Sequence, residues 1–155
     1  MKNSVGLFLL IGLLAVACNR NEPISQFHTF PNATWARFEN LDFEFPVEDI
    51  EKGYDFTIIL KHTAKFPADA LSINVVMNTP GGEERIRDHN LFLKDRDGVF
   101  IGYETDGIFN RTIKLREGMK FQEPGLVKFD IENLMTKYYT PGIIEIGIVM
   151  EVAEE

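Results

Sequence analysis

Cysteine is almost absent from this sequence: Cys18 is the only one in 155 residues. A single cysteine cannot form a disulfide within the chain, so a folded domain must be held together by its core. The 13 phenylalanines and an apolar fraction of 45% make such a core feasible for one domain of this length. The question is therefore what Cys18 itself does.

Positive charge is also scarce, with 16 Lys and Arg against 24 Asp and Glu and a formal net charge of −8. Binding to nucleic acid requires a basic face that meets the phosphates. We therefore expect no nucleic-acid partner. The same charge balance argues against an electrostatic hold on anionic lipid.

The chain has one long apolar run, at residues 5–16. It follows the basic Lys2 and ends in small residues just before Cys18, which is the layout of a secretory signal peptide. The run is too short to span a membrane, which takes about 20 apolar residues. We predict that residues 1–17 are a signal peptide that is removed.

An ordinary signal peptide needs no cysteine after its cleavage site, whereas the bacterial lipoprotein pathway uses one as the acceptor for diacylglycerol. The sequence therefore predicts a lipoprotein signal and lipidation of Cys18 by acyl chains such as palmitate. Ala15 stands where the typical lipoprotein motif has Leu, a variation that the motif tolerates. The alternative is a free cysteine that happens to follow an ordinary signal peptide.

A lipid anchor makes the membrane an expected partner, because two or three acyl chains, at about 0.8 kcal/mol per buried methylene, hold a protein on a bilayer. Asn19 stands where an Asp would signal retention in the inner membrane, which favours the outer membrane. Glu22 is the single acid just after the cysteine, where surface-exported lipoproteins carry several, so we expect the periplasmic face. Residues 18–26 are predicted to be the lipidated N-terminus and a tether.

Apolar residues then alternate with a period of two, which is typical of half-buried strands. The alternating runs are 41–45, 54–60, 71–77, 127–131 and 144–152. Turns rich in Gly or Pro separate the strands, at 51–53, 79–82, 95–98, 116–118, 123–125 and 140–142. The pattern predicts an all-β fold, an antiparallel β-sandwich of jelly-roll type, as a single domain over residues 27–155. At most one short helix is expected, around residues 131–138.

Few residues indicate chemistry. Asp95-x-Asp97-Gly98 resembles part of a calcium loop, but an EF-hand has its Gly two positions later, so a charged hairpin turn is the favoured interpretation. His28, His62 and His89 are too far apart for a local metal pair. His62, at the end of a strand, is expected at the surface or as a capping residue.

Catalysis has little support in the sequence. Ser25 and Ser72 are the serines beyond the signal peptide, and neither lies in a Gly-x-Ser-x-Gly motif. Two of the many carboxylates could still meet in space as a glycosidase-like pair, although nothing marks out any two. We predict a protein that is not an enzyme, with no catalytic residue, metal or cofactor.

Aromatic residues outside the alternating runs offer a binding hypothesis. Trp35, Tyr138 and Tyr139, if exposed, could stack on sugar rings or anchor a protein partner. The alternative is that Trp35 fills the core and the tyrosines cover one end of the sandwich.

The order of motifs resembles the gliding motility-associated lipoprotein family, called GldH. The motifs, after the cysteine, are Trp35, Phe43-Glu44-Phe45, Tyr54, Leu60-Lys61-His62-Thr63, Phe66-Pro67, Asp97-Gly98-x-Phe100-x-Gly102, Phe121-x-x-Pro124-Gly125, Met135 and Pro141-Gly142-Ile143-x-Glu145-x-Gly147. Departures are Lys61, where the family usually has Arg, residues 68–71, which lack the usual Tyr and Asn, and Thr136, which replaces an Arg. These polar changes could alter a partner site while leaving the sandwich intact.

This resemblance implies an outer-membrane lipoprotein of the gliding apparatus, tied to the secretion system that exports the adhesins, with no enzymatic activity. Relatives also occur in bacteria that do not glide, so the broader expectation is an envelope or secretion accessory that contacts other envelope proteins. A glycan-binding lipoprotein is the first alternative. An envelope hydrolase is the second, and it would need two carboxylates about 5 to 10 Å apart in a cleft.

Overall fold

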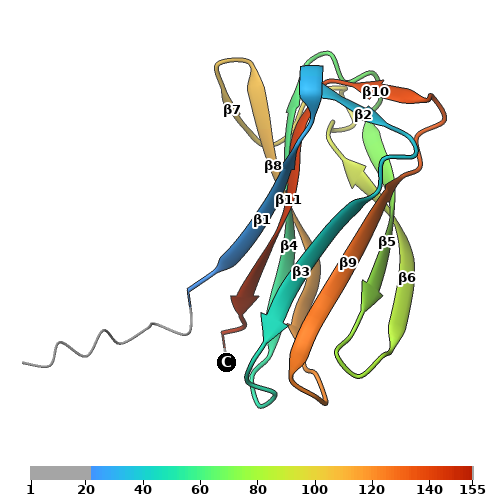
Figure 1. The fold of residues 1–155 in the computed structure, drawn as a ribbon. Coiled ribbons are helices and arrows are strands. Elements are labelled where there is room, and N and C mark those ends of the chain that lie inside the picture. Colours follow the sequence, from blue (N-terminus) through green and yellow to red (C-terminus); the bar gives the residue numbers. More distant parts are fainter. Residues whose placement is uncertain (1–21, 155) are drawn as a thin grey trace, which may run out of the picture.

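The computed structural model describes residues 22–154, and they form the predicted antiparallel β-sandwich (Figure 1). A single turn of 3-10 helix, η1 (Pro31–Ala33), follows the first strand. The strands are β1 (Ile24–Thr29), β2 (Thr34–Ala36), β3 (Leu41–Val47), β4 (Tyr54–Thr63), β5 (Ala70–Asn78), β6 (Glu84–Phe92), β7 (Tyr103–Thr105), β8 (Ile108–Met119), β9 (Gly125–Asn133), β10 (Tyr139–Pro141) and β11 (Ile143–Val152).

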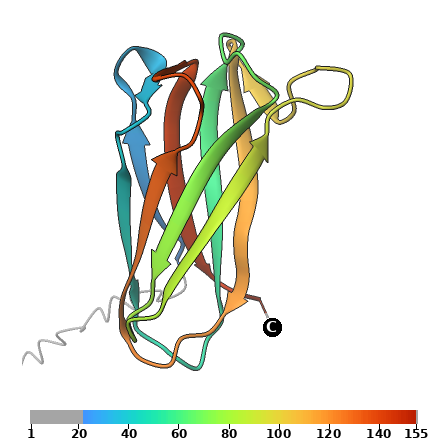
Figure 2. The same cartoon turned by 90° about the vertical axis from the view of Figure 1, so that its right-hand side faces the viewer.

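Two sheets face each other across the core. The first has five strands in the order β1-β11-β4-β8-β7, and the second has four in the order β3-β9-β5-β6. A separate two-stranded sheet of β2 and β10 lies at one end (Figure 1). The chain passes from one sheet to the other after β3, β4, β6 and β8, whereas β5 and β6 form a hairpin within one sheet (Figure 2). This interleaving distinguishes the fold from a simple meander.

The predicted alternation is confirmed in β3, β4, β5 and β9. Their inward residues are Leu41, Phe43, Phe45, Tyr54, Phe56, Ile58, Leu60, Leu71, Ile73, Val75, Met77, Val127, Phe129 and Ile131, all of them buried. Phe56 lies at the centre, with ring centroids 4.9 Å from Phe129 and 6.1 Å from Phe45. Burying each such side chain contributes roughly 1.5–3 kcal/mol, so the two sheets are held together without a disulfide.

The start of β11 differs from the prediction. The register with β4 shifts between Ile143 and Glu145, so Ile143 is fully buried and Ile144 is only half-buried. Ile146 and Ile148 keep the predicted inward position. A β-bulge of this kind places one extra residue in a strand, and simple alternation does not reveal it.

Two other predictions are wrong. Residues 131–138 are not helical, because β9 continues to Asn133 and the chain then bends, with the Asn133 Oδ1 accepting a hydrogen bond from the Met135 N–H at 2.9 Å. Residues 116–118, predicted to be a turn, lie inside β8. A bulge there accommodates Gly118 at φ +57°, and the Asp55 carboxylate accepts a hydrogen bond from the Gly118 N–H at 2.7 Å.

In residues 22–154 no helix is long and apolar enough to cross a membrane.

The two ends of the sandwich carry different segments of the chain. The proximal end carries the start of β1, the end of β11 and the connections at 48–53, 79–83 and 120–124. The distal end carries the segments 30–40, 64–69, 93–107 and 134–142. Figure 1 shows β2, β7 and β10 at the distal end, opposite the last described residues of β11. A tether at the N-terminus therefore leaves the distal end farthest from its attachment point.

The first strand begins earlier than the predicted domain boundary at residue 27. Ile24 already pairs with Met150, so Ile24–Gln26, which the sequence places in the tether, belong to β1. The sequence did not reveal this part of the strand because β1 is an edge strand, with Ser25 exposed and Gln26 half-buried. Such polar residues at a sheet edge leave no apolar periodicity to detect.

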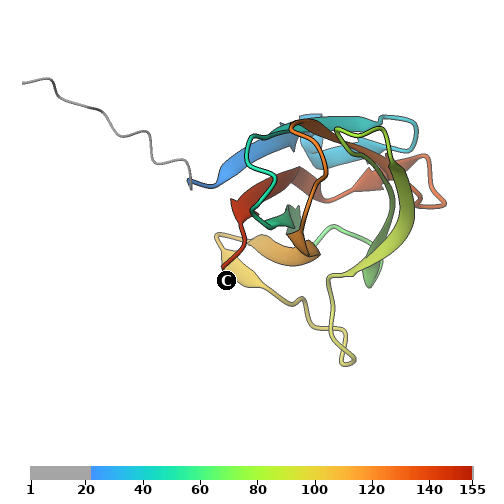
Figure 3. The same cartoon turned by 90° about the horizontal axis from the view of Figure 1, so that it is seen from below.

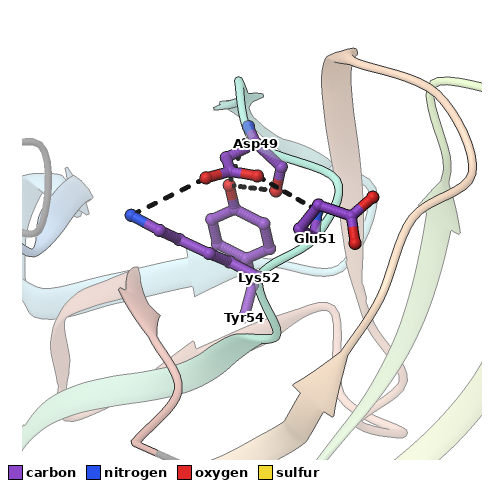
Figure 4. A network of polar contacts seen from close by, with 4 residues as sticks. All are labelled: Asp49, Glu51, Lys52 and Tyr54. Carbon is purple, nitrogen blue, oxygen red and sulfur yellow. Dashed lines mark hydrogen bonds and ion pairs between the residues drawn. The ribbon is translucent and has the colours of Figure 1, made fainter.

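The connection from β3 to β4 is fixed by Asp49 and Tyr54 (Figure 4). The Tyr54 hydroxyl donates to the Asp49 carbonyl at 2.9 Å and accepts from the Asp49 N–H at 3.2 Å. The Asp49 carboxylate accepts from the Glu51 N–H at 3.0 Å and lies 3.9 Å from the Lys52 ammonium. This network satisfies the hydroxyl of a buried tyrosine and orders the turn at the proximal end.

The two flanks of the sandwich differ (Figure 3). On one flank β1 lies beside β3, and the Gln26 amide binds the backbone N–H and C=O of Glu44. On the other flank β6 is the edge of its sheet, and β7 pairs with residues 108–110 of β8. In the part of the chain that the structure describes, the rest of β8 has no neighbouring strand on that side.

Candidate functional site

Trp35, one of the proposed contact residues, lies in the core. Its side chain is 0% exposed, stacks on Phe30 with ring centroids 5.1 Å apart, and donates from Nε1 to the Glu39 carbonyl at 2.8 Å. The placement follows from β2, which points Trp35 inward between two half-buried neighbours. Trp35 therefore has no surface with which to meet a partner, and its part is to fill the distal end of the core.

The two tyrosines lie on the surface of the distal end, next to a third aromatic that the sequence did not single out. Tyr138 is 52% exposed, Tyr139 62% and Phe38 71%. The Tyr138 ring lies 4.6 Å from that of Tyr139 and 5.9 Å from that of Phe38, in both cases edge to face. The Arg37 guanidinium lies 5.9 Å from the centre of the Phe38 ring. We call Arg37, Phe38, Tyr138 and Tyr139 the distal patch.

Hydrogen bonds hold the distal patch to the sandwich. The Arg37 N–H donates to the Tyr138 carbonyl at 2.8 Å, and Tyr139 pairs with Ala36 in the small sheet of β2 and β10. Beneath them the buried Asn133 amide donates to the Trp35 carbonyl at 3.3 Å and to the Thr140 hydroxyl at 3.1 Å. The backbone that carries the aromatic rings is thus fixed by a satisfied polar network, which limits the entropy lost when a partner binds.

A shallow pocket of about 170 Å³ adjoins Tyr139. Its lining is Pro67, Ala68, Met135, Thr136, Lys137, Tyr139 and Thr140. Small-molecule sites usually have pockets of about 300–1,000 Å³, so this hollow suits a single side chain better than a ligand of that size. It includes Ala68 and Thr136, two of the positions at which the sequence departs from the motifs quoted above.

The histidines do not converge. His62 is fully buried, which corrects the expectation of a surface or capping residue. It faces inward in phase with Leu60 and packs against the rings of Phe100 and Phe109, which also contact each other. Burial lowers the pKa of His62. His28 lies 3.2 Å from the Glu39 carboxylate at the distal end, and His89 lies on β6. In residues 22–154 no group of three His, Cys, Asp or Glu is placed to hold a metal.

The loop at Asp95 forms the predicted hairpin turn. The Asp95 carboxylate accepts hydrogen bonds from the N–H groups of Asp97 and Val99, both at 2.9 Å. Gly98 occupies a left-handed position at φ +77°. The side chain of Asp95 thus serves the turn itself, which explains why aspartate is found there.

One pair of carboxylates does meet. Asp42 and Asp130 lie directly opposite each other on β3 and β9, and both point away from the core. Burial and a hydrogen bond with Asp42 raise the pKa of Asp130. The pair lies on the outer face of a sheet rather than across a cleft, so it lacks the arrangement by which glycosidases enclose a sugar.

Asp55 has the opposite character. Its hydrogen bond from the Gly118 N–H, together with the Lys114 ammonium at 3.1 Å, lowers its pKa despite partial burial. An open hollow of about 620 Å³ at the proximal end includes Asp55, Lys114, Glu117 and Glu151. A carboxylate held in its charged form by such partners serves the β8 bulge and is poorly suited to donate a proton.

Sequence reasoning missed Phe38. It follows Trp35 and Arg37 in a segment without strand periodicity, so nothing distinguishes an exposed Phe from a buried one there. Cys18, the predicted lipidation site, lies outside the described residues.

Comparison with known proteins gives a match to one family. Residues 23–150 match the family described as GldH lipoprotein. The gliding motility lipoprotein GldH of Flavobacterium johnsoniae is 25% identical over 122 residues, which cover 79% of this chain and 76% of that protein. The match includes the whole sandwich from β1 to most of β11.

Solved structures give a weaker likeness. The infectious bursal disease virus VP2 subviral particle and the structure of the Gx strain of that virus match with TM-scores of 0.37 and 0.38 at 11% and 12% identity. They cover 99% of this chain, which spans 37% of each viral chain. These scores support no conclusion about this protein. The match over residues 23–150, together with the sandwich that those residues form, shows that the chain belongs to the GldH lipoprotein family.

Proposed function

We propose that this member of the family is an outer-membrane lipoprotein, anchored through Cys18 on the periplasmic face, which contacts other envelope proteins of the gliding and secretion apparatus through the distal patch. It acts as an accessory and not as an enzyme. The observation that carries the proposal is the position of the exposed rings of Phe38, Tyr138 and Tyr139, at the end of the sandwich opposite β1's first residue.

The composition of the distal patch suits a protein partner. Tyrosine and arginine are enriched among the residues that contribute most to protein interfaces, because they bury a large area with few rotatable bonds. The patch combines two tyrosines, a phenylalanine and Arg37 on a fixed backbone. An exposed apolar group of this kind on a soluble domain typically marks a contact surface.

A glycan ligand is the second candidate, since exposed tyrosines can stack on sugar rings. Stacking on a sugar needs a flat platform, whereas the rings of Tyr138 and Tyr139 are 75° apart and those of Phe38 and Tyr138 are 68° apart. Neither pair of adjacent rings can therefore lie flat against one sugar ring. The edge-to-face arrangement favours a protein surface that fills the angles between the rings.

The test is purification of the full-length lipidated protein from its own envelope, followed by mass spectrometry. The Phe38→Ala, Tyr139→Ala double variant should lose the captured envelope proteins, while Phe27→Ala, Tyr103→Ala, which removes two other exposed rings, should retain them. A Cys18→Ala variant should leave the membrane fraction and lose the same proteins. Equal capture by the two double variants would refute the role of the distal patch.

A further inference from the structure

The flank between β6 and β8 collects basic side chains in an otherwise acidic protein. On β6, Arg85, Arg87 and His89 lie opposite Met77, Val75 and Ile73 of β5, whose side chains face the core. Residues directly opposite each other in an antiparallel pair point to the same face, so the β6 residues face inward as well. Because β6 is an edge strand, Arg85 and Arg87 remain exposed at the open flank. His89 is half-buried beside them, and its Nε2 atom is buried.

The other sheet supplies two more arginines to the same flank. Arg111 and Arg116 on β8 lie opposite the inward residues Leu60 and Phe56 of β4. The Arg111 Nε reaches across to the Phe92 carbonyl at the end of β6, at 3.2 Å. We call Arg85, Arg87, His89, Arg111 and Arg116 the basic seam.

The charges of the basic seam repel one another. Burial and then the charges of Arg87 and Arg85 lower the pKa of Arg116. Burial, Arg116 and Arg87 likewise lower the pKa of His89, with Asp88 acting in the opposite direction. Such a cluster destabilises the fold unless an anion is bound to it.

The protein's own carboxylates neutralise little of the basic seam. Arg85 makes a bidentate ion pair with Glu83, at 2.8 and 2.9 Å. Arg116 donates to the Leu115 carbonyl, and within residues 22–154 neither Arg116 nor Arg87 makes an ion pair with a carboxylate. A chain with 24 Asp and Glu therefore leaves cationic groups on both sheets open to an anion from outside.

We propose that the basic seam binds an extended acidic segment of a partner protein, which adds to the free edge of β6 as a further strand. Along that edge the nine residues of β6 pair with no other strand of residues 22–154, and strand addition to an exposed edge is a common mode of peptide recognition. Arginine binds carboxylates with paired hydrogen bonds, so the cationic side chains suit Asp and Glu.

The register predicts the pattern of the segment. Its residues opposite Arg85, Arg87 and His89 would face the seam, and those between them would lie on the outer face beside Ile86, which is 63% exposed. Side chains alternate between the two faces of a strand. The preferred segment therefore has acidic residues at every second position, separated by apolar or β-branched residues.

Inward charges on an edge strand can also serve only to prevent edge-to-edge aggregation. That role needs a charge on β6 alone and gives no reason for Arg111 and Arg116 on the opposite sheet. The basic seam would be a second contact surface beside the one in the proposed function, and its ligand would be an acidic extended segment. Its test leaves the distal patch unchanged, so the proposal for either surface can be refuted independently of the other.

The experiment uses the full chain, purified with its lipid in detergent, and a fluorescent nine-residue peptide in which Glu alternates with Val. Anisotropy should show binding that weakens as salt rises. The Arg87→Gln, Arg116→Gln double variant should weaken binding by roughly tenfold or more, because two charge-assisted contacts are lost. The Arg96→Gln, Lys137→Gln control makes the same change in net charge at exposed positions and should bind as the wild type.

Two further probes identify the ligand class. A peptide of the same composition with its Glu residues grouped at one end should bind more weakly, and inorganic phosphate at equal concentration should not compete. Absence of binding, equal binding of the two peptides, equal loss in the control variant or full competition by phosphate would each overturn the proposal. Aggregation of the seam variant in place of lost binding would assign the arginines to edge protection instead.

Discussion

The imidazole of His62 lies flat against the ring of Phe109, with centroids 5.3 Å apart and planes 15° apart. The contact joins β4 to β8 on the inner side of their sheet. The Nδ1 atom lies 3.3 Å from the Thr63 carbonyl, while Nε2 is buried and has no hydrogen-bond partner among residues 22–154. An imidazole in this position is held as the neutral form, because a charged ring would lose its hydration.

His62 should make the protein less stable in mild acid. Burial lowers its pKa from the ordinary value of 6.5, so the unfolded chain takes up a proton at a higher pH than the folded chain does. The contribution of His62 to the free energy of unfolding is therefore fully present above about pH 6.5 and is lost as the pH falls below it. Urea unfolding at pH 7.5, 6.5 and 5.5 should show this decrease.

In the same titration, His62→Leu should have a smaller decrease between pH 7.5 and 5.5 than the wild type. His28→Gln is the control, because His28 lies at the surface beside Glu39. Some pH dependence will remain in His62→Leu, since burial and nearby arginines also lower the pKa of His89. An unchanged pH dependence in His62→Leu would show that His62 does not cause it.

Gly142 should not tolerate a side chain. Its φ is +86°, and an added Cβ would lie 2.8 Å from the Phe66 Cα and 2.9 Å from the Lys65 carbonyl carbon. The left-handed backbone alone costs roughly 1–2 kcal/mol for alanine, and the backbone clash adds to it. Gly98 has a φ of +77° and open space around an added Cβ, so Gly98→Ala should lose only the cost of the left-handed backbone. Thermal unfolding of both variants checks this, and equal losses would contradict it.

The buried Asn133 should be needed for the distal end. Asn133→Ala leaves the Trp35 carbonyl and the Met135 N–H without their partner and should cost about 1–3 kcal/mol. Asn90→Ala removes an exposed amide that bonds to the Ser72 hydroxyl, and should cost far less. Denaturant unfolding gives both values. A small loss for Asn133→Ala would mean that water replaces the amide.

Removing the charge of Asp130 should stabilise the protein at neutral pH. Its raised pKa shows that the folded state holds the proton more tightly than the unfolded chain does, so stability decreases as the pH rises through that pKa. Asp130→Asn should gain roughly 0.5 kcal/mol at pH 7, because like charges directly opposite in a sheet repel.

The gain from Asp130→Asn should disappear at a pH below about 4, where the carboxyl is already protonated. Asp97→Asn, in an exposed turn, removes one negative charge elsewhere and serves as the control. A gain of the same size in Asp97→Asn would assign the effect to net charge rather than to the pair.

The sequence predicts the sandwich because its central strands bury every second residue, as in β4 from Tyr54 to Leu60. His62 continues this phase and could have been assigned to the core, but a histidine at a strand end was expected to meet water. The edge strand β6 was not recognised, since Arg85, Arg87 and His89 occupy its inward positions. Charged inward residues are possible only because the strand has a neighbour on one side.

The distal patch was only partly predictable, because local sequence patterns do not report how distant segments pack together. Tyr138 and Tyr139 were singled out by their position outside the alternating runs, and they are exposed. Trp35 met the same criterion and is buried, because β2 and β10 fold over the end of the core. Contacts between β2 and β10 join segments about a hundred residues apart, which local patterns do not report.

The direction of β1 sets how the domain bears mechanical load. Ile24, where the described strand begins, is at the proximal end, and β1 runs antiparallel to β11 from Ile24 to Thr29. A pull between an N-terminal tether and the distal end is directed along the strands, and ladder hydrogen bonds are perpendicular to them. The bonds between β1 and β11 are then loaded together in shear, instead of being broken one after another. A domain tethered in this way resists force best along the line from membrane to distal end.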